Sequence, residues 1–90
     1  MDIVRNKIVG EVLTAVRREH LLTQEDVAAL TGYSQSTISK TEAGQRQLPF
    51  IESYLFCAAM GEAPMDFINR VYIRLGEENL LPVEKPEDEE

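Results

Sequence analysis

The side chains best suited to recognition chemistry lie close together in residues 34–43. If this stretch is helical, one of its faces carries Ser36, Ser39 and Lys40, and Gln35 reaches outward from the first turn. The face offers hydroxyls, an amide and a cation, with no large apolar side chain among them. Such a helix can enter a DNA major groove and form hydrogen bonds to base edges. The competing interpretation of Ser36 and Ser39 is that they only keep a short helix hydrated.

Covalent catalysis and metal chemistry have little support in the sequence. The chain has one histidine, His20, and one cysteine, Cys57, and it shows neither a metal-ligand spacing nor a glycine-rich phosphate loop. Cys57 stands between Phe56 and Ala58, which is typical of a small core residue rather than a nucleophile. We therefore expect a protein that is not an enzyme and that uses no metal and no cofactor.

Two short helices joined by a tight turn must position the polar face. Thr23 and Ser34 each precede an amphipathic segment and can accept hydrogen bonds from the free N–H groups of a helix start. Gly32 suits a turn with positive φ, and Ala28 is small enough to let the two helices cross. The side chains expected to point inward from this pair of helices are Val27, Leu30, Tyr33, Ile38 and Thr41.

A series of residues around this helix pair matches a known pattern. It consists of Arg17, Leu22-Thr23-Gln24, Val27-Ala28, Gly32, Ser34-Gln35-Ser36-Thr37-Ile38-Ser39-Lys40, Glu42, Gly44 and Arg46. In this order the residues resemble the phage-repressor and Cro type of helix-turn-helix domain, also called the Xre family. The resemblance covers about residues 5–75 and implies an all-α, five-helix fold like that of lambda repressor, with a short acidic C-terminal tail.

The resemblance also implies which side chains contact DNA. Gln35 would pair with adenine and Lys40 would donate to guanine, each contact being worth ~1–3 kcal/mol of discrimination. The full set of base-reading candidates is Gln35, Ser36, Ser39 and Lys40. The candidates for phosphate contacts are Gln24, Thr37, Arg46 and Gln47. The competing interpretation of Gln24 and Arg46 is that they are solvated surface residues.

An internal ion pair is implied as well. In the family that this sequence resembles, an arginine at the position of Arg17 pairs with a glutamate at the position of Glu42, which would join the first helix to the third. The alternative is that Arg17 is one of several exposed charges, together with Arg18 and Glu19.

The function that the resemblance implies is sequence-specific binding of double-stranded DNA by a transcriptional regulator. We expect a dimeric repressor that binds an inverted-repeat operator and blocks polymerase. The alternative is a protein-binding module on the same fold, such as an antitoxin that neutralises a toxin and represses its own operon.

The net charge of −7 is unusual for a DNA-binding protein, because Lys and Arg normally neutralise phosphates. The acidity is concentrated at the end of the chain, since residues 1–76 carry a net charge of −1 and residues 77–90 a net charge of −6. We therefore divide the chain into a helix-turn-helix domain, 1–76, and a partly disordered acidic tail, 77–90. With no apolar run of ~20 residues and no secretory leader, we expect no membrane contact and a cytoplasmic location.

Three further helices are predicted around the helix pair, at about residues 3–20, 49–60 and 64–75. The segment 49–60 is apolar on most sides, so we expect it to be buried or shared with a second subunit. The last helix also carries more apolar side chains than one buried face needs. We expect it to form a homodimer interface through Phe67, Ile68, Val71, Tyr72 and Leu75. The competing explanation is that these residues pack against Leu80, Leu81 and Val83 of the same chain.

Overall fold

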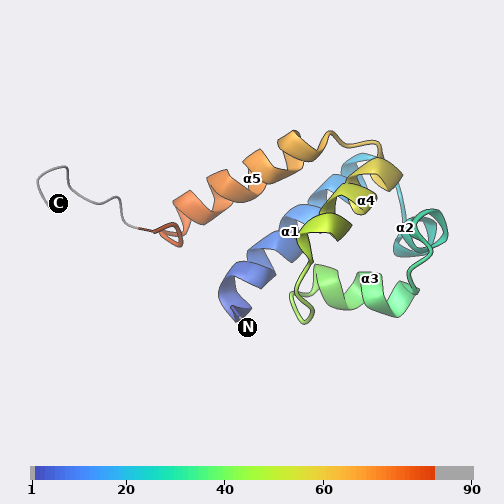
Figure 1. Cartoon of the computed structure of the whole chain (residues 1–90), viewed down its shortest axis with the longest axis horizontal. Helices are drawn as coiled ribbons and strands as arrows, with labels where there is room; N and C mark the ends of the chain where they lie inside the picture. The colour runs from blue at the N-terminus through green and yellow to red at the C-terminus, as the bar shows by residue number, and fades with distance from the viewer. Residues whose placement is uncertain (1, 83–90) are drawn as a thin grey trace, which may run out of the picture.

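The computed structural model describes residues 2–82 and contains five α-helices, with no β-strand among these residues (Figure 1). The helices are α1 (Ile3–Glu19), α2 (Gln24–Thr31), α3 (Gln35–Glu42), α4 (Phe50–Met60) and α5 (Pro64–Glu77). The predicted all-α, five-helix fold is confirmed, with helix ends within one or two residues of those expected. Residues 83–90, which include Val83 and most of the predicted acidic tail, lie outside the described part of the chain.

Local capping determines where the helices begin and end. Thr23 and Asp26 form a capping box at the start of α2, in which each side chain accepts from the other residue's backbone N–H. The Ser34 hydroxyl accepts from the Thr37 N–H at 3.1 Å and caps α3. Gly32 ends α2 with a φ of 83°, a left-handed conformation that glycine adopts without a Cβ clash.

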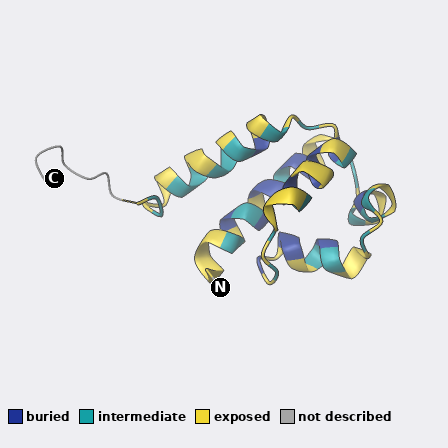
Figure 2. Cartoon of the chain, viewed as in Figure 1, coloured by how far each residue is buried: buried dark blue, intermediate teal, exposed yellow. Residues whose placement is uncertain are grey.

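The core forms around the middle of α1. This helix packs against α3 and α5, while α2 packs against α3 and α4. Figure 2 shows the buried residues gathered on the sides of α1, α3 and α4 that face one another. The buried cluster comprises Val12, Leu13, Val16, Val27, Ile38, Phe56, Cys57, Met60 and Phe67. Because all five helices contribute to this cluster, the orientation of α3 depends on the whole domain.

A glycine lets α1 and α3 approach closely. A Cβ at Gly10 would overlap the backbone carbonyl of Glu42 and would lie 2.7 Å from the carbonyl oxygen of Thr41. No side chain can therefore replace the hydrogen of Gly10 without moving the last turn of α3. The lower helix propensity of glycine, ~1 kcal/mol relative to alanine, is the cost of this close approach.

One expectation about an apolar residue needs correction. Leu30 is 59% exposed, so it does not join Val27 in the core as predicted. The segment 49–60 was expected to be buried or shared with a second subunit, and within the protomer α4 turns Phe50, Ile51 and Leu55 to the surface, with Phe50 71% exposed. One face of α4 is enough to complete the core of so small a domain. The rest of α4 therefore forms an apolar outer face.

The predicted dimer residues of α5 do not share one environment. Phe67 is only 3% exposed and belongs to the core of the protomer, so it has no surface left to contact a second copy. Ile68, Val71 and Leu75 are half-buried, and Tyr72 is 61% exposed. The segment after α5 also turns back, since the carbonyl of Leu80 accepts a hydrogen bond from Arg5 Nε at 2.7 Å and Leu81 is half-buried. Intrachain packing thus covers part of α5.

In the part of the chain that the structure describes, no helix has the length and apolar character needed to cross a membrane.

Candidate nucleic-acid interface

Helix α3 has one polar exposed face and one buried face. Gln35, Ser36 and Lys40 are exposed, and Ser39 is half-buried beside them. The opposite face carries Ile38 at 1% exposure, together with Thr41 and Glu42. The base-reading candidates thus lie at the surface, on a helix whose inner face is anchored in the core.

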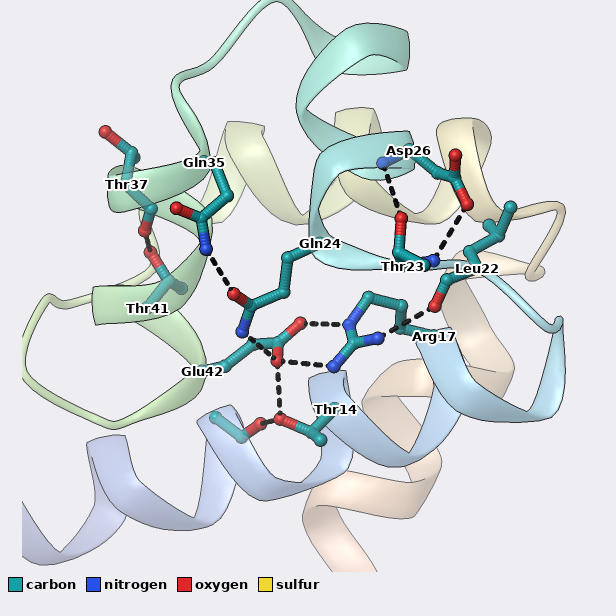
Figure 3. A network of polar contacts seen from close by, with 11 residues as sticks. Thr14, Arg17, Leu22, Thr23, Gln24, Asp26, Gln35, Thr37, Thr41 and Glu42 are labelled. Atoms are coloured by element: carbon teal, nitrogen blue, oxygen red, sulfur yellow. Dashed lines mark hydrogen bonds and ion pairs between the residues drawn. The ribbon is translucent and has the colours of Figure 1, made fainter.

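An ion pair joins α1 to the last turn of α3 (Figure 3). Arg17 Nε donates to Glu42 Oε2 at 2.6 Å, and Arg17 Nη2 donates to Glu42 Oε1 at 3.0 Å. The third guanidinium nitrogen, Nη1, donates to the Leu22 carbonyl at 2.8 Å. Arg17 and Glu42 are 8% and 9% exposed. Because the pair is bidentate and largely shielded from water, it fixes both the distance and the orientation of α3 relative to α1.

Gln24 links this ion pair to the recognition face. Its Nε2 donates to Glu42 Oε1 at 3.0 Å, and its Oε1 accepts from Gln35 Nε2 at 2.6 Å, as Figure 3 shows. A carboxylate can only accept hydrogen bonds, so the Gln24 amide must turn its nitrogen toward Glu42 and its oxygen toward Gln35. The Gln35 amide is oriented in turn. Its Oε1 and its second N–H remain free, which is the acceptor–donor pair needed to bind one adenine edge.

The hydrogen bonds around Glu42 keep its carboxylate charged. Burial acts to raise the pKa of Glu42, but hydrogen bonds from Arg17, Gln24 and Thr14 outweigh burial and place the pKa below its ordinary value. The Thr14 hydroxyl is 3.1 Å from Glu42 Oε1. The orientation of Gln35 therefore depends on a carboxylate that stays ionised at neutral pH.

The four phosphate candidates each lie in a different environment. Gln47 is exposed. Gln24 is half-buried, and its amide nitrogen uses one N–H to bond Glu42 and keeps the other N–H free. The Thr37 hydroxyl lies 2.9 Å from the Ser34 hydroxyl at the start of α3. Arg46 instead turns toward α4, where its Nη2 bonds both carboxylate oxygens of Glu52 at 2.8 and 2.9 Å. The structure thus places Arg46 beside α3 but in contact with an acid of its own chain.

Few cations near α3 are free of an acidic partner. Within residues 2–82, five arginines form ion pairs with acidic side chains. The lysines and arginines in this range that form no such pair are Lys7, Arg18 and Lys40. Lys7 was not predicted as a site residue. Its backbone touches the turn after α3, since a Cβ at Gly44 would lie 2.7 Å from Lys7 Cα. Nothing in the sequence pattern indicated this neighbour, because Lys7 lies on α1 and Gly44 in the turn after α3, far apart along the chain.

A family model described as a helix-turn-helix domain matches residues 8–61, more than half of the chain. The chain belongs to the helix-turn-helix family. The chain is 37% identical over 62 residues to y4dJ, an uncharacterised HTH-type transcriptional regulator of Sinorhizobium fredii. That match covers 69% of this chain and 80% of the relative.

Solved structures share this helix-turn-helix fold. The restriction–modification controller protein C.AhdI of Aeromonas hydrophila aligns with a TM-score of 0.65 and 26% identity, covering 69% of this chain and 94% of that one. The controller protein C.Esp1396I, solved as a tetramer in complex with its natural operator, aligns with a TM-score of 0.72 and 22% identity. That alignment covers 79% of this chain and 93% of C.Esp1396I. The fold of this chain is therefore shared with restriction–modification controller proteins.

Proposed function

We propose that this helix-turn-helix protein is a transcriptional regulator that binds double-stranded DNA in a sequence-specific way. The observation that carries the proposal is the hydrogen-bonded series from Arg17 through Glu42 and Gln24 to Gln35, which orients an exposed amide on α3. An amide held in one orientation discriminates between bases, because reversing it would place donor against donor. The operator complex of C.Esp1396I, a protein with the same fold, adds support.

In the proposed complex, α3 lies in the major groove. Gln35 binds adenine through Oε1 and its free N–H, and Lys40 donates to guanine one turn further along the groove. Ser36 and Ser39 contact neighbouring base edges. Phosphate contacts that fix the position of α3 come from the free N–H of Gln24, from Thr37 and Gln47, and from Arg46 once it leaves Glu52.

The protein acts as a homodimer in this proposal. A groove of about 350 Å³ lies between α4 and α5 and is lined partly by Phe50, Ile68 and Val71. Ile51 on α4 and Tyr72 on α5 are also exposed. Exposed apolar side chains around a groove suit pairing with an identical copy. Two-fold symmetry would place two α3 helices about one DNA turn, ~34 Å, apart.

The proposed mechanism is repression by occlusion, which needs no component besides the bound dimer. A dimer bound over a promoter blocks polymerase without a cofactor, without a metal and without catalysis, and the place of action is the cytoplasm. In this proposal residues 1–76 form the DNA-binding domain and residues 77–90 its acidic tail, although Glu77 still belongs to α5 and the Leu80 carbonyl bonds Arg5.

The test is selection of bound duplexes from a random pool at low salt. We expect enrichment of an inverted repeat with one conserved A·T pair in each half-site, and Gln35→Ala should remove the preference at that pair alone. Lys40→Ala should weaken binding by ~1–3 kcal/mol. Arg18→Gln, which also removes a cation without an acidic partner but lies on α1, is the matched control and should bind as the wild type does.

The apolar outer face of α4 favours one second candidate, a module that binds another protein, such as a toxin. Selection that enriches no sequence would support it and would refute the DNA-reading role. In that case Phe50→Asp should abolish the protein complex, whereas Lys40→Ala should leave it intact. For a DNA-binding homodimer, Phe50→Asp should instead give monomers in sedimentation equilibrium.

A further inference from the structure

The guanidinium of Arg46 is bound inside the protomer although the residue lies in the turn that follows α3. Its Nη2 bonds both carboxylate oxygens of Glu52, and its Nη1 donates to the Thr41 hydroxyl at 3.1 Å. The side chains of Arg46 and Glu52 are 29% and 14% exposed. A carboxylate of α4 therefore neutralises a cation that stands next to the recognition helix.

The turn itself is held against the end of α3. The Gln45 N–H donates to the Lys40 carbonyl at 2.9 Å, and the Gly44 N–H donates to the Thr41 carbonyl at 3.1 Å. These bonds keep the backbone of Arg46 beside the last turn of α3, the turn that carries Lys40. A guanidinium released from Glu52 would thus extend from the same end of the helix as Lys40.

Release of Arg46 would leave Thr41 satisfied. The Thr41 hydroxyl donates to the Thr37 carbonyl at 2.8 Å, so it loses only an accepted hydrogen bond when Arg46 departs. Glu52, by contrast, would keep a largely buried negative charge without its partner, and a buried unpaired charge is unfavourable. Glu52 is therefore the group that opposes movement of Arg46 toward a phosphate.

We propose that Glu52 keeps Arg46 away from the DNA backbone and so lowers the affinity of this protein for duplexes that lack its operator. The proposal rests on the proposed DNA-binding function. Non-specific affinity comes almost entirely from cation–phosphate contacts, and few cations near α3 are free. One contact fewer is a large share of that attraction. In the operator complex, where Arg46 leaves Glu52, the contact is regained, so the difference in affinity between operator and other duplexes rises.

The test compares the full-length wild type with Glu52→Gln on a random-sequence duplex, by fluorescence anisotropy between about 0.05 and 0.2 M salt. We expect Glu52→Gln to bind about tenfold tighter at the lowest salt and to steepen the plot of log affinity against log salt by about 0.9, the value for one added phosphate contact. Arg46→Gln alone should leave the affinity for the random-sequence duplex as it is in the wild type. Added to Glu52→Gln, it should remove the whole gain in affinity.

A matched control frees an arginine elsewhere. Arg74 Nη2 donates to Glu11 Oε1 at 2.7 Å between α5 and α1, and Glu11→Gln makes the same change of charge there. Its salt dependence should equal that of the wild type. If circular dichroism shows that Glu52→Gln is unfolded, Glu52→Asp, whose shorter side chain moves the carboxylate away from Arg46, should steepen the plot instead.

The outcomes separate this proposal from the function on which it rests. If the wild type binds duplex DNA and the folded Glu52 variants show the same salt dependence, the role of Glu52 is refuted while DNA binding stands. A loss of affinity in Arg46→Gln alone also refutes it, because Arg46 would then already contact phosphate. If neither the wild type nor the Glu52 variants bind any duplex at low salt, the role of Glu52 and the DNA-binding function both fail.

Discussion

Replacing Arg17 by Met should destabilise the domain strongly at neutral pH and much less in acid. The change removes two hydrogen bonds to Glu42 and one to the Leu22 carbonyl, and it leaves a carboxylate that is 9% exposed with donors only from Thr14 and Gln24. Leaving one member of a buried ion pair uncompensated costs about 3–5 kcal/mol in the free energy of unfolding. That is a large part of the total stability of a small domain.

The pH dependence gives the sign of the effect. In the wild type the folded-state pKa of Glu42 lies below the ordinary 4.5, so the ionised pair stabilises the protein above that pH, and the stabilisation is lost as pH falls through the folded value. Without Arg17, burial is opposed by weaker hydrogen bonds, and we expect the pKa of Glu42 to rise above 4.5. Between pH 7 and pH 5 the folded variant then binds more protons at Glu42 than the unfolded chain does. Its free energy of unfolding should therefore increase as pH is lowered from 7 to 5.

The assay is urea unfolding followed by circular dichroism at pH 7 and pH 5. Adding Glu42→Gln to the Arg17→Met variant should recover stability at pH 7, because the buried charge is gone. Arg70→Met removes a more exposed arginine, paired with Glu19 at 2.7 Å, and should have a much smaller effect at either pH. A loss of stability in Arg17→Met that is equal at the two pH values, or that is below about 1 kcal/mol, would contradict this account of the pair.

Two further predictions concern packing and thiol chemistry. Gly10→Ala should lower the free energy of unfolding by about 1–3 kcal/mol, because the new Cβ overlaps the end of α3. Gly76→Ala on α5, whose Cβ meets only Leu81 at 3.5 Å, should raise the free energy of unfolding by about 0.5–1 kcal/mol. Thermal unfolding measures both changes. Burial raises the pKa of Cys57 to about 11, so about one thiol in a thousand is ionised at pH 8, and its reaction with a disulfide reagent should be far slower in the native protein than in urea. Equal rates in the two states would show that Cys57 is accessible.

Helix positions and the inner face of the helix pair were predictable because they depend on neighbours along the chain. The capping residues Thr23 and Ser34 act on N–H groups three residues away. Ile38 and Val27 are buried, as their spacing indicated. Leu30 was misplaced because spacing assigns it to the same helix face as Val27 but does not show how much of that face the facing helix covers.

The site itself was only partly predictable. The family pattern named Arg17 and Glu42 as partners, and the structure places their side chains in contact. The bond between Gln24 and Gln35, which orients the reading amide, and the bond between Arg46 and Glu52 were not indicated by any motif. Both join side chains of different elements, and side-chain direction across a turn depends on how the helices pack.

The sequence alone determined that this chain forms five helices of the helix-turn-helix family and that polar groups occupy one face of the third helix, because caps, glycines and apolar periodicity act within a few residues. Only the tertiary structure decided which charges remain available at that face and which apolar residues stay outside. Charges are neutralised by acids from other helices, as Arg46 is by Glu52, and burial depends on how much of a helix its neighbours can cover in a domain with a small core.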